Sequence, residues 1–346
     1  MELKIAKAED RKLWDKLVEK SPQGTLFHRW DFLKIIEKHS KARLCPIIGM
    51  KGADEIGVYP LFYKKSAMLR TVFSPPPHVA AFYMGPALSG EVSARKSRKT
   101  SMFAEFQQAA DDYISKDLKA DYVSVHTVPD LDCRPLKWTG YRLDAIYNYR
   151  FDLAIGPDRI WEGFDSEIKR GIKKTQAAGV SVEEGGKEEV AKLFDLMNDR
   201  YEEQGKTVSV PKQYLLEVYD AFADNLKIMV AKYNGEMVSG VMDIRYKGRY
   251  TGWIGNPKTD LHGIYPNNLL LWESVKCAHR DGAGRFDIVG AAGIHRLSRY
   301  YEGFGPDLML NFAAIKYNSL GAKAMEHIYL KAFKPARSKV LLMMKK

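Results

Sequence analysis

The chain has 346 residues, a formal charge of +11 and 45% hydrophobic residues, which is ordinary for a globular protein and predicts about two domains. The charged N-terminus is not that of a signal peptide, and no apolar run approaches the ~20 residues of a membrane span. The net charge favours an anionic partner, such as nucleic acid, a nucleotide, a phosphorylated substrate or a membrane surface, although it serves solubility equally well.

The first part of the chain alternates helices, paired strands and loops. Apolar spacing predicts helices over 9–20, the latter part of 25–38 and 101–118. Strands are expected in 44–63 as a joined pair, in 121–127 and in 147–155. The segments 71–90, rich in proline, and 128–146 are expected to be irregular.

The pattern then changes to longer helices followed by strands. Helices are predicted over 158–180, 187–205, 209–222 and 266–282. Residues 226–246 form a hairpin, because Asn234-Gly235 is the favoured type I′ turn pair, and 249–255 is a further strand. The stretch 284–317 reads as strand, loop, short helix, turn and strand, and 318–334 as a final helix.

The two halves share one order of elements, which indicates a duplication. The hairpins 44–63 and 226–246, the helices 101–118 and 266–281, and the strands 121–127 and 285–291 correspond in pairs. Segments 136–153 and 297–315 are also alike. The sequence therefore predicts a repeated α+β unit of roughly 150 residues, with extra helices over 158–222 in the second copy.

Several short motifs occur in the order seen in one family. They are TLFHRWDFLK (25–34), SEIKRGIKKTQAAGVSVE (166–183), FDLMNDRYEEQG (194–205), PNNLLLWESVKCAHRDGAGRFDIVGA (266–291) and YYEGFGPD (300–307). In this order they resemble the Fem-type aminoacyltransferases, which build peptidoglycan cross-bridges and lie within the GNAT (N-acetyltransferase-like) superfamily. The resemblance covers most of 155–317 and extends more weakly over 20–150.

The resemblance implies an α+β fold with a mixed sheet and two tandem GNAT-like domains. Residues 1–150 with 318–346 would form the acceptor side, the C-terminal helix returning to this domain, and 151–317 the donor and catalytic side. It implies an acyltransferase that moves an acyl or aminoacyl group from an activated donor to an amine, without metal or other cofactor. Family donors are aminoacyl-tRNAs, whereas ordinary GNAT enzymes use acyl-CoA.

One family position differs in a way that bears on the chemistry. The family's lysine in Phe-Lys-x-x-Phe-Gly falls on Tyr301, and the preceding phenylalanine on Tyr300. A phenol makes a weaker hydrogen bond than a cation, by roughly a factor of two. Tyr301 is therefore a candidate general acid toward the leaving group, with acyl-CoA as the alternative donor.

Acyl transfer to an amine needs a base, oxyanion donors and a stabilised leaving group. Asp287 and Asp243 are candidate bases, although either could be structural. Backbone amides near 253–256 or 290–293 are candidate oxyanion donors. Tyr301, Arg299 and Arg296 are placed by sequence near the leaving group, although a solvated loop explains these residues equally well.

Substrate-binding candidates are spread over both halves of the chain. Lys169, Arg170 and Lys173 form one basic face of the helix 158–178, which suits a phosphate-bearing partner such as tRNA or is simply solvated. Asn267 and Asn268 begin a helix where an anion could bind. Tyr300 is a further substrate-binding candidate. His28, Trp30 and Lys34 are candidates for an acceptor groove, although Trp30 is favoured as a core residue.

Two further functions remain open from the sequence. One is an acyl-CoA-dependent N-acyltransferase, and the other is a non-catalytic basic module that binds nucleic acid or an anionic surface. The enzyme is expected in the cytoplasm, with an amine-bearing, anionic acceptor and peripheral membrane contact through the tail 339–346 as an option. The sequence does not specify the acceptor, the acyl group or the oligomeric state.

Overall fold

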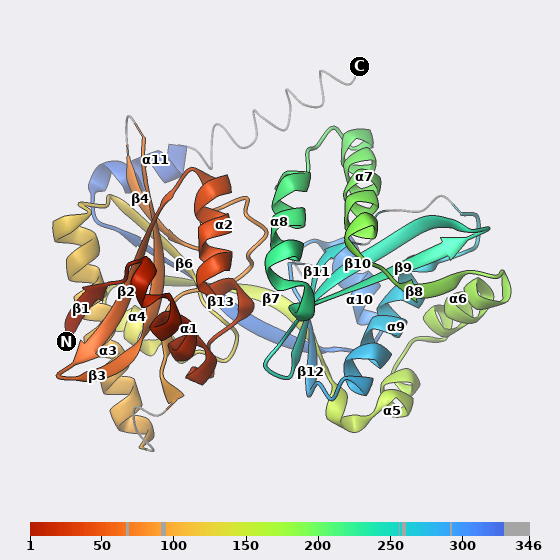
Figure 1. Ribbon diagram of the computed structural model, residues 1–346, viewed down its shortest axis with the longest axis horizontal. Helices are drawn as coiled ribbons and strands as arrows, with labels where there is room; N and C mark the ends of the chain where they lie inside the picture. The colour runs from red at the N-terminus through yellow and green to blue at the C-terminus, as the bar shows by residue number, and fades with distance from the viewer. Residues whose placement is uncertain (67–68, 91–94, 256, 258–260, 291–292, 329–346) are drawn as a thin grey trace. The chain divides into compact units, whose positions relative to one another are not determined.

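The computed structural model describes residues 1–66, 69–90, 95–255, 257, 261–290 and 293–328. The chain divides into two compact units, one formed by Met1–Ala145 and the segment from Asn311 onward, the other by Ile146–Leu310 (Figure 1). The boundaries expected from the sequence lay after residues 150 and 317. The tail 339–346 lies outside the described residues.

The first unit contains a mixed sheet in the order β1-β2-β3-β4-β6-β13, with β5 paired to β3. Its strands are β1 (Glu2–Ile5), β2 (Arg43–Lys51), β3 (Asp54–Lys65), β4 (Arg70–Ser74), β5 (Ala87–Leu88), β6 (Tyr122–His126) and part of β13 (Asp307–Tyr317). Its helices are α1 (Arg11–Lys20), α2 (Trp30–Ser40), α3 (Lys96–Asp112), α4 (Arg134–Trp138) and α11 (Leu320–Ile328). The final helix thus belongs to the first unit, as expected.

The second unit contains a sheet in the order β8-β9-β10-β11-β12-β7. Its strands are β7 (Arg142–Asp152), β8 (Ser181–Glu184), β9 (Leu226–Tyr233), β10 (Glu236–Tyr246), β11 (Arg249–Gly255) and β12 (Arg285–Ile288). Its helices are α5 (Pro157–Glu162), α6 (Ser166–Ala177), α7 (Lys187–Glu203), α8 (Lys212–Phe222), α9 (Pro266–Arg280) and α10 (His295–Glu302).

The two sheets have the same topology. In each, a run of antiparallel strands is followed by one parallel pair, β4 with β6 in the first unit and β11 with β12 in the second. A helix, α3 or α9, connects the two parallel strands, as a parallel connection requires. Each sheet then ends on an antiparallel strand, β13 against β6 and β7 against β12. The predicted tandem arrangement is confirmed.

Several local features were not expected from the sequence. Strands β1, β4 and β8 are short, and β4 lies in the segment 71–90 that was expected to be irregular. The helix predicted over 158–180 is instead two helices, α5 and α6, separated at Gly163–Asp165. The amide of Asp165 donates to the Gly303 carbonyl (2.8 Å), so a long-range contact provides a partner for the backbone at the break.

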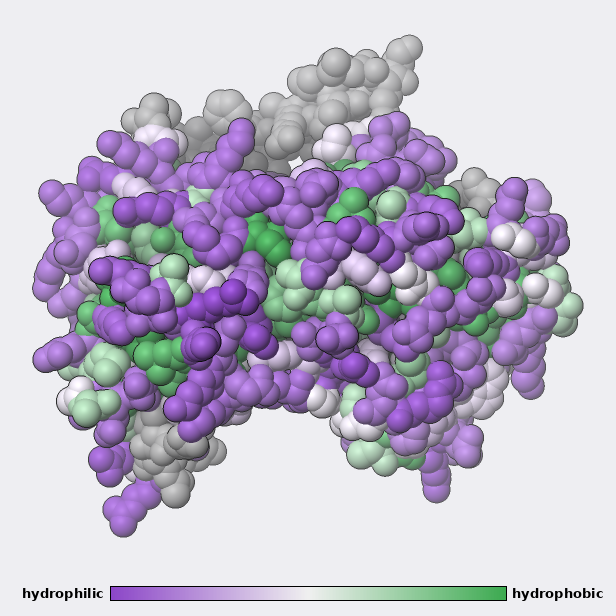
Figure 2. All heavy atoms as spheres, viewed as in Figure 1, coloured by the Kyte–Doolittle hydropathy of each residue, from purple (hydrophilic) through white to green (hydrophobic). Residues whose placement is uncertain are grey.

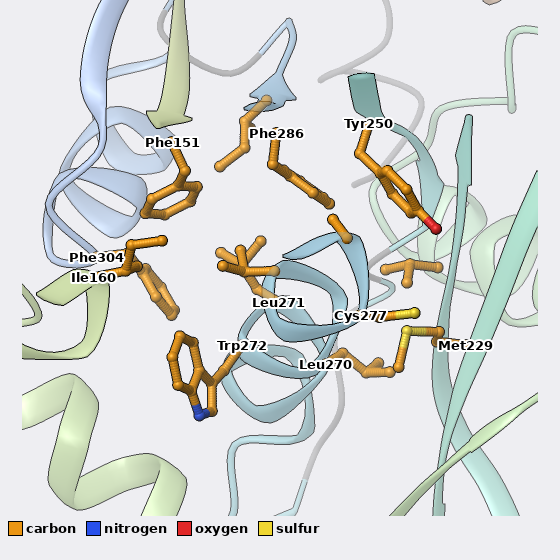
Figure 3. Close-up of a cluster of buried hydrophobic side chains, with 14 of the residues drawn as sticks. Phe151, Ile160, Met229, Tyr250, Leu270, Leu271, Trp272, Cys277, Phe286 and Phe304 are labelled. Carbon is orange, nitrogen blue, oxygen red and sulfur yellow. The ribbon is translucent and has the colours of Figure 1, made fainter. Parts of the chain in front are cut away.

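The core of the second unit lies between its sheet and α9. Leu271 of the helix lies beneath Phe286 of β12, and Cys277 lies beside Met229 of β9 (Figure 3). Trp272 packs edge-on against Phe164, with ring centroids 5.2 Å apart. This packing fixes α9 on the sheet and thereby the position of its first turn.

Polar and charged side chains cover most of the face seen in Figure 2, with apolar side chains showing only in small patches between them. Over the described residues, no helix combines the length and the apolar character that crossing a bilayer would require.

Candidate active site

A cavity of about 850 Å³ lies within the second unit. Its walls come from α7, from strands β10, β11 and β12, and from helices α9 and α10. The polar and aromatic residues that line it are Arg200, Tyr201, Gln204, Lys206, Asp243, Trp253, Tyr265, Asn267, Asn268, Ser274, Phe286, Arg296, Tyr300 and Tyr301. A cavity of this size can hold most of a small-molecule ligand.

The cavity opens where two parallel strands separate. The pairing of β11 with β12 runs from Arg249–Arg285 to Gly252–Ile288, after which β11 continues to Gly255 while β12 ends. On its other side, β11 has a bulge against β10: Asp243 pairs with Gly252 and Met242 with Ile254, so Trp253 is the extra residue. A bulge turns its strand and re-aims nearby side chains, and this one lies in the part of β11 that lines the cavity.

Asp243 on β10 forms part of the cavity wall, and its side chain is 2% exposed. Its Oδ2 atom has no hydrogen-bond partner among the described residues. Burial raises the pKa of Asp243 to about 7, although hydrogen bonding by Ser274 of α9 opposes the shift. The cavity therefore contains a carboxyl group that can gain and lose a proton near neutral pH.

Helix α10 brings Tyr300 and Tyr301 into the cavity wall, with their ring centroids 5.0 Å apart in an edge-to-face arrangement. The helix is tied to β7 because the Tyr149 hydroxyl donates to Glu302 Oε1 (2.8 Å) and contacts Ser298. Burial, and then the neighbouring Tyr301, raise the pKa of Tyr300 well above its ordinary value, so its hydroxyl stays protonated.

The start of α9 forms another wall and is held by polar contacts. Asn267 accepts from the Ser239 hydroxyl and donates through Nδ2 to the Pro257 carbonyl (2.9 Å). The amide of Tyr265 donates to Thr175 Oγ1 of α6 (2.8 Å). Asn267 and Asn268 both line the cavity, as does Arg296 of α10. These residues, with Tyr300 and Tyr301, are the predicted site residues that the structure brings together.

Asp287 and Arg299 are not among the residues that line the cavity. Asp287 is directly opposite Arg150 in the ladder between β12 and β7, and Arg150 Nε lies 2.6 Å from Asp287 Oδ1. The Arg285 guanidinium is 3.8 Å from the same carboxylate. This ion pair gives Asp287 a structural environment, whereas Asp243 lines the cavity. The predicted role of Arg299 stays a prediction.

The basic residues of α6 do not line the cavity either. Lys169 donates to the Glu162 carbonyl (2.9 Å), while Arg170 and Lys173 are exposed. The opposite face of α6 packs on the start of α9: a Cβ at Gly171 would lie 3.3–3.4 Å from the Tyr265 ring and the Asn268 amide. Helix α6 therefore supports one wall of the cavity, and phosphate binding by its basic face stays a prediction.

In the first unit, the equivalent opening is filled by the chain itself. Beyond the β4–β6 pairing, Met84 forms a bridge with Thr127, and its amide donates to the His126 carbonyl (2.7 Å). The amide of Gly85 donates to Ser74 Oγ (3.1 Å). Residues 83–86 thus occupy the place beside β6 that corresponds to the cavity of the second unit.

His28, Trp30 and Lys34 were candidates for an acceptor groove, with Trp30 favoured as core; Trp30 does lie in the core of the first unit, and so does His28. His28 has no exposed surface; Nε2 donates to the Gly85 carbonyl (3.2 Å) and Nδ1 accepts from Thr25 Oγ1 (2.8 Å). Trp30 packs edge-on against Trp14. Neither side chain can contact an acceptor in this conformation. Lys34 is exposed and pairs with Glu37.

One candidate oxyanion donor is already engaged. The amide of Gly290 lies at the cavity and donates to Asn148 Oδ1 (2.9 Å). It is therefore not free for an oxyanion. Residues 256, 291 and 292, which belong to the predicted donor segments, lie outside the described residues.

Comparison with known proteins finds one family model and several solved structures that this chain resembles. Residues 163–300 match the family model of the acetyltransferase (GNAT) domain. No curated protein matches the sequence. Among solved structures, FemX has a TM-score of 0.68 at 13% identity, covering 90% of this chain and 97% of that chain.

Two other structures also match over nearly the whole chain. L-PGS from Bacillus licheniformis has a TM-score of 0.55 at 14% identity, covering 93% of this chain and 96% of that one. A tandem GNAT protein from the clavulanic acid biosynthesis pathway, solved without AcCoA, has a TM-score of 0.54 at 11% identity, covering 92% and 99%. At these identities the likeness concerns the fold.

The match of residues 163–300 to the acetyltransferase (GNAT) domain supports an acyltransferase. The second unit is a GNAT acetyltransferase-type domain, and the chain as a whole has the Fem-like tandem GNAT fold.

Some residues of the cavity were not singled out from the sequence. Arg200 and Tyr201 of α7 appeared only as members of a helix, and Ser274 only as part of the α9 motif. Gly252 offered the clearest signal, because a glycine inside a strand often marks a bulge or a close approach of another group. Here it lies beside the bulge and opposite Asp243.

Proposed function

We propose that the cavity of the second unit transfers an acyl or aminoacyl group from an activated donor to an amine. The observation that carries the proposal is the position of the cavity at the point where β11 and β12 separate, with the Tyr300–Tyr301 pair on one wall and a buried carboxyl group on another. The GNAT family match of residues 163–300 supports acyl transfer at this place.

The cavity supplies groups that suit each partner in such a reaction. The hydroxyl of Tyr301 can donate a hydrogen bond or a proton to the leaving oxygen or sulfur. Arg296 of α10 and Lys206, just beyond α7, bring positive charge to the rim, which suits an anionic donor or acceptor. An aminoacyl-tRNA and an acyl-CoA both carry phosphates, so both remain candidate donors, and the cytoplasm is the expected location.

The test uses the purified full chain with a CoA thioester, charged tRNA and their unacylated forms as probes. Calorimetry measures donor binding, and mass spectrometry follows acylation of a panel of amines. We expect one donor class to bind and to be consumed only when an amine is present. If neither class binds or turns over, the proposed transfer is wrong.

A matched pair of variants ties the reaction to the cavity. Gly252 lines it, and a Cβ there would lie 3.6 Å from the Phe286 ring, so Gly252→Val adds a side chain inside the cavity. Gly284 has no atoms within 4 Å of such a Cβ, so Gly284→Val is the control. Donor binding or turnover should fall at least tenfold in the first variant and stay within twofold in the second.

The alternative of a basic, non-catalytic binding module rests on the charge of +11. It predicts binding of nucleic acid or anionic vesicles that weakens steeply with salt and is accompanied by no turnover. The calorimetric experiment at two salt concentrations tests for such binding. Gly252→Val separates the two functions as well, because it would leave binding to the protein surface unchanged.

A further inference from the structure

The mouth of the cavity in the second unit exposes apolar side chains. Tyr265, just before α9, and Ile294, just before α10, both line the cavity, and they are 49% and 53% exposed. Their neighbours Ile264 and Leu297 pack against the core between the sheet and α9, so both segments lie on the same side of the sheet. Single exposed apolar residues are normal on a protein surface, but two of them at one opening indicate a contact with a partner.

Helix α6 adds positive charge beside this mouth. The Tyr265 ring lies against α6, because a Cβ at Gly171 would be 3.3 Å from it. Lys174 reaches the same loop, since a Cβ at Gly263 would collide with its Nζ atom. Arg170 is four residues before Lys174, which puts both on one stripe of the helix, and both side chains are exposed.

The cations around the mouth have no acidic partner, in contrast to those of α7 and α8. Arg170, Lys174 and Arg296 form no ion pair within the described part of the chain, and neither does Glu167, one turn before Gly171. The lysines of α7 and α8 are paired instead, Lys187 with Asp220, Lys192 with Glu189 and Lys212 with Asp195. The mouth therefore carries a net positive charge that neighbouring carboxylates do not neutralise.

We propose that this mouth surface, formed by Arg170, Lys174, Tyr265, Ile294 and Arg296, binds an anionic lipid bilayer. Cations beside half-exposed aromatic and aliphatic side chains suit such a surface, because the charges meet the lipid headgroups while the apolar groups enter beneath them. This binding goes beyond the proposed transfer and needs neither donor nor acceptor, so it holds or fails independently of the transfer.

A bilayer fits the mouth surface better than a nucleic acid does. The cations would serve both partners, and the Tyr265 ring could stack on a base as well as enter a lipid headgroup layer. Ile294 favours the bilayer, because an exposed aliphatic side chain gains by leaving water for hydrocarbon and gains nothing beside phosphates. Leu261 and Ile264, which are partly buried and line the same cavity, extend the apolar rim.

The binding is expected to be reversible, which makes single contributions measurable. Three cations and two half-exposed side chains are fewer anchors than a stably membrane-bound protein uses. Each cation close to an anionic membrane surface changes the affinity by about fivefold. The loss of all three should therefore lower the partition coefficient by about 100-fold.

The first experiment measures cosedimentation of the full chain with vesicles of equal parts phosphatidylglycerol and phosphatidylcholine, and with vesicles of phosphatidylcholine alone. The mouth variant carries Arg170→Gln, Lys174→Gln and Arg296→Gln. The control variant lowers the net charge by the same amount on α7 and α8, through Lys187→Gln, Lys192→Gln and Lys212→Gln.

We expect the wild type to bind the anionic vesicles and not those of phosphatidylcholine alone. The mouth variant should bind the anionic vesicles about 100-fold more weakly, and the control variant less than about threefold more weakly. A wild type that does not bind the anionic vesicles, or equal losses in the two variants, would overturn the proposal.

A second pair of variants tests the apolar part of the mouth surface. Ile294→Ser should weaken binding to the anionic vesicles about tenfold, because it removes a side chain that leaves water on binding. Ile155→Ser is the matched control: Ile155 is also 53% exposed, but the adjoining Leu153 carbonyl contacts His279 near the far end of α9. Its binding should stay within twofold, and a loss equal to that of Ile294→Ser would contradict the proposed surface.

A fluorescent label reports insertion directly. The three native cysteines are buried, so Ile294→Cys and Ile155→Cys can each be labelled selectively with an environment-sensitive fluorophore. With anionic vesicles, only the label at residue 294 should shift its emission to shorter wavelength. An unshifted label there refutes bilayer binding, and loss of unacylated tRNA binding in the mouth variant would then identify a nucleic acid as the partner.

Discussion

Arg150 on β7, which is partly exposed, and Asp287 on β12, whose carboxylate is 2% exposed, form an ion pair with Nε 2.6 Å from Oδ1. Asp243, on the same sheet and equally buried, has no such cation among the described residues. Two aspartates that both lie within strands of one sheet thus differ in whether a cation is paired with the carboxyl group. The first is paired with an arginine, and the second lines the cavity without such a pair.

Removing the cation of this pair should destabilise the fold. Arg150→Met leaves the Asp287 carboxylate buried with only the more distant Arg285, and breaking a buried pair typically costs about 3–5 kcal/mol. Urea denaturation monitored by fluorescence measures the loss. Arg159→Gln removes an exposed pair with Glu162 and should cost less than about 1 kcal/mol. Equal losses in the two variants would contradict the structural role of Asp287.

Replacement of Asp243 by asparagine should change the pH dependence of stability. The folded state holds the Asp243 proton up to a pKa of about 7, against an ordinary value of 3.8, so between these values the folded state binds more protons than the unfolded state. The stability of the wild-type protein therefore falls as pH rises through this window. The side-chain amide of the Asp243→Asn variant does not titrate.

The Asp243→Asn variant should accordingly match the wild type below pH 4 and gain relative stability up to pH 7 and above. The limit of this gain is about 4 kcal/mol, from about 1.4 kcal/mol per pKa unit. Urea denaturation at pH 5, 6, 7 and 8, roughly spanning the window, provides the measurement. A stability difference that does not change with pH would show that Asp243 has an ordinary pKa.

Tyr301 should contribute to turnover through its hydroxyl. Tyr301→Phe removes a candidate proton donor to the leaving group while keeping the ring that packs near Tyr149, and a lost general acid typically costs about 10²-fold or more in kcat. Steady-state kinetics with the donor that binds is the measurement. Tyr219→Phe, on helix α8, is the control and should keep kcat within twofold. Comparable kcat values in both variants would remove Tyr301 from the reaction.

The turn after α10 should tolerate no side chain. Gly305 has a φ of +66°, and a Cβ there would lie 2.7 Å from the Gly163 carbonyl oxygen at the break between α5 and α6. Gly305→Ala should destabilise the protein by about 1–3 kcal/mol because the backbone must shift. Gly284→Ala, with open space around the added methyl group, should change stability by less than about 0.5 kcal/mol. Thermal unfolding of both variants decides between a rigid and an adaptable turn.

The sequence was informative wherever structure follows from local spacing. The hairpin at Asn234-Gly235 was predictable because both residues take a positive φ, as the type I′ turn requires. Helices α7, α8 and α9 were predictable from their apolar periodicity. The order of hairpin, helix and strand in both halves, together with the motif around Tyr300 and Tyr301, also led to the tandem GNAT fold.

The sequence by itself therefore determined most of the longer elements, their repetition and the residues of α10, because each depends on neighbours within a turn or a strand, whereas the short strands and the break between α5 and α6 did not follow from it. The sequence already placed the catalytic side in 151–317, but only the tertiary structure showed what fills the equivalent place in the first unit, where residues 83–86 contact His28, Ser74 and His126. It also separated Asp243 from Asp287, because the state of a buried carboxyl group depends on charges that reach it from strands distant in sequence.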